Sequence, residues 1–182
     1  MNLNISNILT ISRIIIIPII VILIYLKDPF SSWLAFILFC LAGITDYFDG
    51  YFARIRKEIS NLGTFLDPIA DKLLVASVIL ILTSKETISN FEIIPALIIL
   101  VREIAVSGLR EFLAEIKVSI PVSKISKFKT ALQLIALGIL ILSEGGFSIL
   151  PILLFGKIAL WIAALLTLYS GFDYLKSGLK HF

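Results

Sequence analysis

Six long apolar stretches constrain the fold of this chain more than any other feature. They cover residues 8–26, 33–53, 62–82, 91–113, 128–142 and 147–175. A helix needs about 20 mostly apolar residues to cross a bilayer, where it satisfies its own backbone hydrogen bonds. Hydrophobic residues make up 59% of the chain, above the roughly 45–50% of soluble domains. We therefore expect an all-α, polytopic membrane protein with six transmembrane helices, built as a single domain over residues 1–182.

Basic residues predict how these helices are oriented. Lysine and arginine concentrate in the connections after the second and fourth stretches and near the C-terminus, whereas the opposite connections contain only Lys27 and Lys85. Because cytoplasmic loops are rich in lysine and arginine, both termini are expected in the cytoplasm. The net charge of +3 fits such loops and anionic lipid head groups, so no nucleic-acid partner is expected.

Two single residues limit the available chemistry. Cys40 is the one cysteine and His181 the one histidine, so an intrachain disulfide and a metal site built on these residue types are excluded. The N-terminus lacks the basic region and the small-residue cleavage site of a signal peptide. We expect the first apolar stretch to remain as a membrane helix.

Four aspartates interrupt the second and third apolar stretches: Asp46, Asp49, Asp67 and Asp71. Carboxylates at membrane depth are costly and normally serve an ion, a proton or a substrate. Residues three or four apart share a helix face, and the short connection should bring the two helices side by side. Four converging carboxylates need a counter-charge, and all-oxygen ligation favours Mg²⁺, Mn²⁺ or Ca²⁺ over zinc. The spacing therefore predicts a site for two divalent cations.

The residues between the aspartates help to separate this metal site from an ion or proton pathway. A pathway needs carboxylates, but it does not need small residues and an arginine at fixed positions. Gly50, Ala53 and Gly63 lack bulk, which allows a ligand to approach the helix backbones and also allows close helix packing. Arg54 is suited to hold phosphate.

The complete pattern is Asp-x2-Asp-Gly-x2-Ala-Arg-x8-Gly-x3-Asp-x3-Asp, from Asp46 to Asp71. It resembles the signature of the CDP-alcohol phosphatidyltransferase family at every fixed position. The resemblance implies a six-helix membrane bundle, commonly a homodimer, that transfers a phosphatidyl group from CDP-diacylglycerol to an alcohol and releases CMP. It also implies two Mg²⁺ or Mn²⁺ ions bridged by Asp46 and Asp67, with Asp49 on one and Asp71 on the other. Asp71 is the candidate general base.

The same resemblance assigns the nucleotide contacts. Asn7, Thr10 and Arg13 recur every three residues, like a stretch beside the nucleotide site in the family, although N-capping and a snorkelling arginine are alternatives. The expected residues for binding CDP-diacylglycerol are Asn7, Thr10, Gly50, Arg54, Ser60 and Gly63. We expect the site to face the cytoplasm from the plasma membrane.

Residues 101–112 and 124–133 resemble the glycerol-phosphate branch of the family. Arg110, Lys127 and Lys129 offer a cationic pocket for a phosphorylated acceptor, which favours sn-glycerol 3-phosphate. A positive loop that contacts anionic lipid is the alternative. Arg102 and Glu103, in the middle of the fourth stretch, are equally compatible with a structural ion pair and with a functional role.

Two further functions stay open at this point. The first is the same reaction with another acceptor: serine, inositol phosphate or phosphatidylglycerol. A neutral or zwitterionic acceptor should be indifferent to loss of Arg110, Lys127 and Lys129. The second is a non-enzymatic cation transporter, which would carry ions across liposomes without CDP-diacylglycerol.

Overall fold

The computed structural model describes residues 5–56, 61–118, 124–146 and 150–178. Within these helices, the side chains of residues 5–6, 46–56, 61–62, 64, 124–125, 150 and 177 are not described. The elements are α1 (Ile5–Leu26), α2 (Pro29–Arg56), α3 (Asn61–Ser84), η1 (Asn90–Glu92), α4 (Ile93–Glu115), α5 (Lys124–Glu144) and α6 (Leu150–Gly178). The prediction of an all-α fold is confirmed, since the described residues contain no strand.

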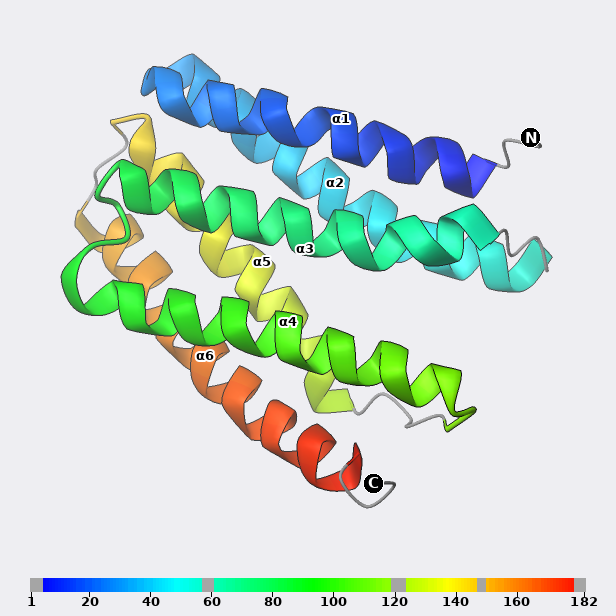
Figure 1. Cartoon of the computed structure of the whole chain (residues 1–182). Coiled ribbons are helices and arrows are strands. Elements are labelled where there is room, and N and C mark those ends of the chain that lie inside the picture. Colours follow the sequence, from blue (N-terminus) through cyan, green and yellow to red (C-terminus); the bar gives the residue numbers. More distant parts are fainter. Residues whose placement is uncertain (1–4, 57–60, 119–123, 147–149, 179–182) are drawn as a thin grey trace.

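The six helices form a bundle in which α1, α3 and α4 lie in front of α2, α5 and α6 (Figure 1). The start of α1 and the end of α6 lie at the same end of the bundle, as the even number of helices requires. We expected consecutive α2 and α3 to pack side by side. They approach each other closely at few positions, whereas α1 packs extensively against both. The adjacency predicted from the short connection is therefore indirect, because α1 bridges the two helices.

Small residues bring the helices of the rear layer close together. A Cβ added at Gly138 of α5 would lie 3.0 Å from the Phe36 ring of α2, and one at Gly156 of α6 would lie 2.9 Å from Leu140 of α5. Close backbone approach is a usual source of helix association in lipid. These contacts fix α5, which carries part of the site described below.

Three helices in the described part of the chain are long and apolar enough to span a membrane, in the segments Asn7–Leu26, Ser126–Glu144 and Pro151–Lys176. The corresponding apolar segment of α2 is shorter, Pro29–Thr45. Charged residues such as Asp67, Asp71 and Arg102 lower the hydropathy of α3 and α4. These helices indicate a membrane protein, while six spans and cytoplasmic termini stay predictions.

All six helices extend past the predicting stretch at one end or both, although α4 begins inside its stretch, at Ile93. The most consequential extension is in α5, which begins at Lys124 rather than at residue 128. Hydropathy cannot detect a polar first turn, because that turn contributes no apolar residues. As a result Lys127 lies on a helix and not in a loop.

Candidate active site

The polar face of α1 meets the carboxylates of α3. Asn7, Thr10 and Arg13 are 3%, 0% and 1% exposed, so all three point into the protein. The Thr10 hydroxyl donates a hydrogen bond of 2.5 Å to Oδ1 of Asp67. The structure thus brings together a residue predicted to bind the nucleotide and a residue predicted to bind metal, 57 positions apart.

Asp67 and Asp71 lie one turn apart on α3 and are both partly buried. Residues four apart share a helix face, and both aspartates line a cavity of about 260 Å³ between α3 and α4. Gly63, one turn before Asp67, is buried at the start of α3. The α3 part of the predicted site therefore forms one continuous face.

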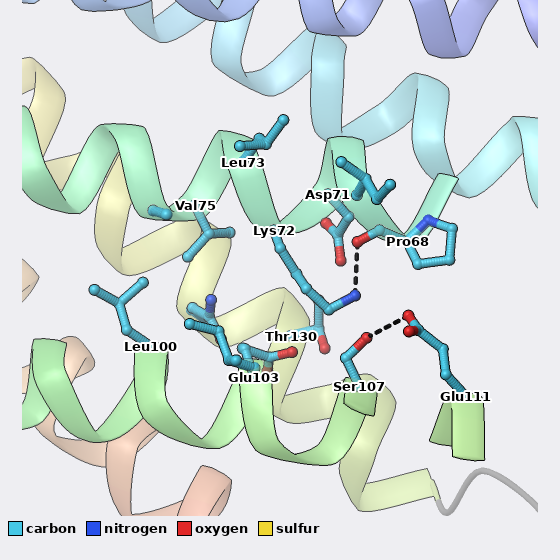
Figure 2. Close-up of a pocket in the computed structure, with 14 residues that line it drawn as sticks. Pro68, Asp71, Lys72, Leu73, Val75, Leu100, Glu103, Ser107, Glu111 and Thr130 are labelled. Carbon is cyan, nitrogen blue, oxygen red and sulfur yellow. Dashed lines mark hydrogen bonds between the residues drawn. The ribbon is translucent and has the colours of Figure 1, made fainter. Parts of the chain in front are cut away.

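A second cavity of about 290 Å³ adjoins the first and extends between α3, α4 and α5. We call the two together the α3–α4 cleft, because both are lined by Pro68, Asp71, Lys72, Glu103, Ser107 and Glu111. Figure 2 shows Asp71 and Lys72 on the α3 side, with Glu103 and Ser107 facing them from α4. Within the cleft, Lys72 donates to the Pro68 carbonyl at 2.6 Å and Ser107 donates to Glu111 at 3.3 Å.

Behind the cleft, an ion pair links α4 to α5 and a hydrogen bond links α4 to α6. Lys129 is 2% exposed and its ammonium forms a short ion pair with Glu103. Arg102 contacts the same carboxylate at 3.3 Å and donates to the Ser170 hydroxyl at 3.1 Å. A Cβ at Gly171 would lie 2.8 Å from Arg102 Cγ, so glycine leaves room for this arginine. The pairing of Arg102 and Glu103 thus has a clear structural component.

The three cations predicted to bind the acceptor phosphate occupy different environments. Lys129 is buried in the ion pair, whereas Arg110 and Lys127 are exposed. Arg110 lines the smaller cavity with Asp67 and Asp71, and its guanidinium lies 5.6 Å from the centre of the Tyr174 ring. Lys127 lines neither cavity of the cleft. Arg110 is therefore the best placed of the three to meet a ligand near the carboxylates.

The predicted metal site falls only partly within the described residues. The side chains of Asp46, Asp49, Gly50 and Arg54 on α2 and the whole of Ser60 lie outside them. Among the described side chains, no cluster of three or more His, Cys, Asp or Glu residues could hold a metal ion. Asp67 and Asp71 supply carboxylate oxygens on one face, which is the donor chemistry that Mg²⁺ and Mn²⁺ prefer. The residues present therefore fit such ions.

Two residues of the cleft, Ser107 and Glu111, were not predicted from the sequence, whereas Glu103 was considered for a structural or a functional role. Glu103, Ser107 and Glu111 recur every four residues along α4 and all line both cavities. This spacing marks a polar face on an otherwise apolar helix, and it was available as a signal. Ser170 and Gly171 gave no such signal, because their roles depend on how α6 packs against α4.

The chain also has relatives among known proteins. Residues 3–169 match the family described as CDP-alcohol phosphatidyltransferase, whose members are generally dependent on divalent metals. A protein of Rickettsia bellii is 51% identical and aligns over 98% of this chain and 97% of its own length. Relatives from Shigella flexneri and Cereibacter sphaeroides are 38% and 36% identical, over 98% and 100% of this chain and 96% and 98% of their own. All three are named "CDP-diacylglycerol--glycerol-3-phosphate 3-phosphatidyltransferase".

Proposed function

Because the chain belongs to the CDP-alcohol phosphatidyltransferase family, we propose that it transfers the phosphatidyl group of CDP-diacylglycerol to sn-glycerol 3-phosphate. The products are CMP and phosphatidylglycerophosphate, a step of phospholipid biosynthesis. The observation that carries this proposal is the α3–α4 cleft, where Asp67 and Asp71 share a cavity with Arg110. Carboxylates suited to metal-assisted phosphoryl transfer and a cation suited to a phosphorylated acceptor thus lie in one cavity. The names of the relatives agree with this acceptor.

The reaction forms one bond and breaks one. The primary hydroxyl oxygen of glycerol 3-phosphate attacks the phosphorus atom that bears the diacylglycerol, and the bond from that phosphorus to CMP breaks. Asp71 is assigned as the base that takes the hydroxyl proton, since it lines both cavities of the cleft. A proton acceptor positioned in this way contributes about 10²- to 10⁴-fold to a rate.

The proposed metal ligands are Asp46, Asp49, Asp67 and Asp71, which would hold two divalent cations, Mg²⁺ or Mn²⁺. When bound, such ions neutralise the diphosphate and stabilise the charge that develops on the departing CMP. The Thr10 hydroxyl donates a hydrogen bond to one oxygen of Asp67, and this bond holds the carboxylate in a single orientation. A fixed carboxylate binds a ligand at a smaller entropic cost.

CDP-diacylglycerol is proposed to bind at the same end of the bundle as the proposed metal ligands. The proposed contacts in the described part of the chain are Asn7 and Thr10, buried on α1, and Gly63, buried at the start of α3. The remaining proposed contacts are Gly50, Arg54 and Ser60. Since the acyl chains are apolar, they are proposed to stay in lipid while the head group enters the protein from the cytoplasmic side of the plasma membrane.

The acceptor phosphate is proposed to bind Arg110, Lys127 and Lys129. The three residues differ in their surroundings. Arg110 lines the cleft, and Lys127 is exposed. Lys129 already forms an ion pair with Glu103, so it would have to contact the phosphate and this carboxylate together. Guanidinium groups bind phosphate with two parallel hydrogen bonds, which makes Arg110 the principal ligand. Both termini in the cytoplasm, a single domain over residues 1–182 and a homodimer complete the proposal.

The test is CMP release by purified protein in detergent, supplied with CDP-diacylglycerol, Mg²⁺ or Mn²⁺, and one acceptor at a time. The proposal expects release with glycerol 3-phosphate, loss of release with a chelator, and recovery when the metal is restored. Release with only serine, inositol phosphate or phosphatidylglycerol would keep the family and replace the acceptor. Cation flux into sealed vesicles without CDP-diacylglycerol, together with no release, would favour a transporter.

A further inference from the structure

Gln133 is a buried polar residue to which the proposed reaction has so far given no role. It lies on α5 four residues after Lys129, so the two share a helix face. The residue is 2% exposed, yet it lines the larger cavity of the α3–α4 cleft together with Asp71 and Glu103. Gln133 is therefore shielded from bulk solvent while it forms part of the wall of this cavity.

The other polar side chains that line the larger cavity have partners. Glu103 pairs with Lys129 and Arg102, Lys72 donates to the Pro68 carbonyl, Ser107 donates to Glu111, and Thr130 donates to the Ser126 carbonyl. Asp71 also has an interaction partner. The Gln133 Oε1 atom, by contrast, is buried and accepts no hydrogen bond from the described part of the chain. Leaving such a group unsatisfied is destabilising, so a donor is expected in the cavity.

We propose that Gln133 accepts a hydrogen bond from the secondary hydroxyl of the acceptor and thereby makes the site selective for a polyol phosphate. This inference rests on the proposed glycerol-phosphate acceptor. In that molecule the reacting primary hydroxyl meets Asp71, the phosphate meets the cations, and the secondary hydroxyl is left between them. Apolar side chains such as Leu73, Val75 and Leu100 form much of the remaining wall of the larger cavity, and the Gln133 Oε1 atom is a buried acceptor there that has no donor in the described part of the chain.

The size of the cavity agrees with a small polar ligand. Its volume of about 290 Å³ lies at the lower end of the roughly 300–1,000 Å³ typical of ligand pockets. A site that hydrogen-bonds a substrate hydroxyl discriminates strongly against an analogue that lacks it, because the buried protein group then stays unpaired. Discrimination between two such acceptors is therefore the property to measure.

The experiment compares glycerol 3-phosphate with 3-hydroxypropyl phosphate, which keeps the primary hydroxyl and the phosphate but lacks the secondary hydroxyl. CMP release gives kcat/KM for each acceptor, in wild type, in Gln133→Met and in Leu137→Met. The control residue Leu137 lies one turn further along α5 and is 0% exposed. We expect wild type and the control to prefer glycerol 3-phosphate by about 10- to 100-fold, and Gln133→Met to lose most of this preference.

A structural role for Gln133 predicts a different pattern. It would lower kcat/KM equally for both acceptors and leave their ratio unchanged, which would overturn the inference alone. Equal use of both acceptors by wild type would overturn it as well, and this measurement does not depend on whether a variant folds. If Gln133→Met does not fold, Gln133→Asn keeps the carboxamide at a shorter reach and is expected to reduce the ratio. No turnover of glycerol 3-phosphate by wild type would overturn the proposed function as well.

Discussion

The two walls of the α3–α4 cleft differ in how their charges are held. On α3, Asp67 and Asp71 share one face, and the hydroxyl that contacts Asp67 comes from α1. On the opposite side, Arg110 lines the cleft and is exposed, whereas Lys129 lies behind it, buried in an ion pair with Glu103. Spacing along one helix is enough to align the carboxylates, whereas the cations acquire different roles only through the packing of α4, α5 and α6.

This contrast separates groups that react or recognise a ligand from groups that organise the wall. A buried charge that loses its partner is costly, so the ion pair of Glu103 and Lys129 should matter for stability. An exposed cation contributes little to stability and is free to meet an anionic substrate. Substitutions on both sides of the cleft test this division.

Replacing the proposed base tests the carboxylate wall. Asp71→Asn keeps the shape of the side chain but removes its basicity, so CMP release should fall by about 10²- to 10⁴-fold. The matched control is Glu115→Gln, an exposed carboxylate at the end of α4, which should retain activity. Near-normal turnover in a folded Asp71→Asn protein would show that another group takes the proton.

Breaking the buried ion pair tests the organised part of the other wall. Lys129→Met leaves the Glu103 carboxylate with Arg102 alone and should destabilise the protein by roughly 1–3 kcal/mol, measured as a lower melting temperature in detergent. Adding Glu103→Gln to the same chain should restore part of this stability, since position 103 then carries no carboxylate without its lysine, while Arg102 keeps its hydrogen bond to Ser170 but loses its ion pair. If Lys129 also binds the acceptor phosphate, the KM for glycerol 3-phosphate stays high in the double variant.

Removing the exposed cation Arg110 should change the KM for glycerol 3-phosphate and leave the stability of the protein almost unchanged. Arg110→Gln is expected to raise the KM for glycerol 3-phosphate about 10-fold, because a charge-assisted bond to phosphate is lost. The melting temperature should hardly change, since surface substitutions usually alter stability by about 0.5 kcal/mol or less. An unchanged KM for glycerol 3-phosphate would show that the acceptor phosphate does not bind Arg110 on α4.

The hydroxyl that joins α1 to α3 can be removed without changing side-chain shape. Thr10→Val deletes the donor to Asp67, and a hydrogen bond to a charged group contributes about 1.5–3 kcal/mol, so turnover should fall about 10-fold. Thr83→Val is the control, because the Thr83 hydroxyl donates to the Ile79 carbonyl within its own helix. If Thr10→Val and Thr83→Val have the same turnover, the hydrogen bond to Asp67 does not contribute to the reaction and Thr10 has only a packing role.

Asp28 is a carboxylate outside the cleft and should show the smallest effect. It caps α2: Ser31 donates its hydroxyl and its amide to this carboxylate, and these bonds lower the pKa of Asp28 below its ordinary value of 3.8. A lowered pKa gives a stabilising contribution above the ordinary value that is lost as pH falls through the value in the folded protein. The melting temperature of wild type should therefore slightly exceed that of Asp28→Asn at pH 7, and the difference should vanish in acid.

The sequence predicted the class of fold and the family better than the arrangement of the site. Apolar length identified every helix, and the spacing from Asp46 to Asp71 identified the family, which the relatives confirm. The spacing could not tell that Lys129 is buried and Arg110 exposed, because both lie in similar basic segments. It also could not reveal the contact of Arg102 with Ser170, or the unsatisfied oxygen of Gln133. Such features depend on which helices become neighbours.

Both walls of the cleft are proposed to act on glycerol 3-phosphate. The most direct test supplies purified protein with CDP-diacylglycerol, a divalent metal and an equimolar mixture of glycerol 3-phosphate, serine, inositol phosphate and phosphatidylglycerol. The lipid products are then identified by mass spectrometry. We predict phosphatidylglycerophosphate as the dominant product in wild type and its disappearance in Asp71→Asn. A different phosphatidyl lipid as the main product would contradict this account.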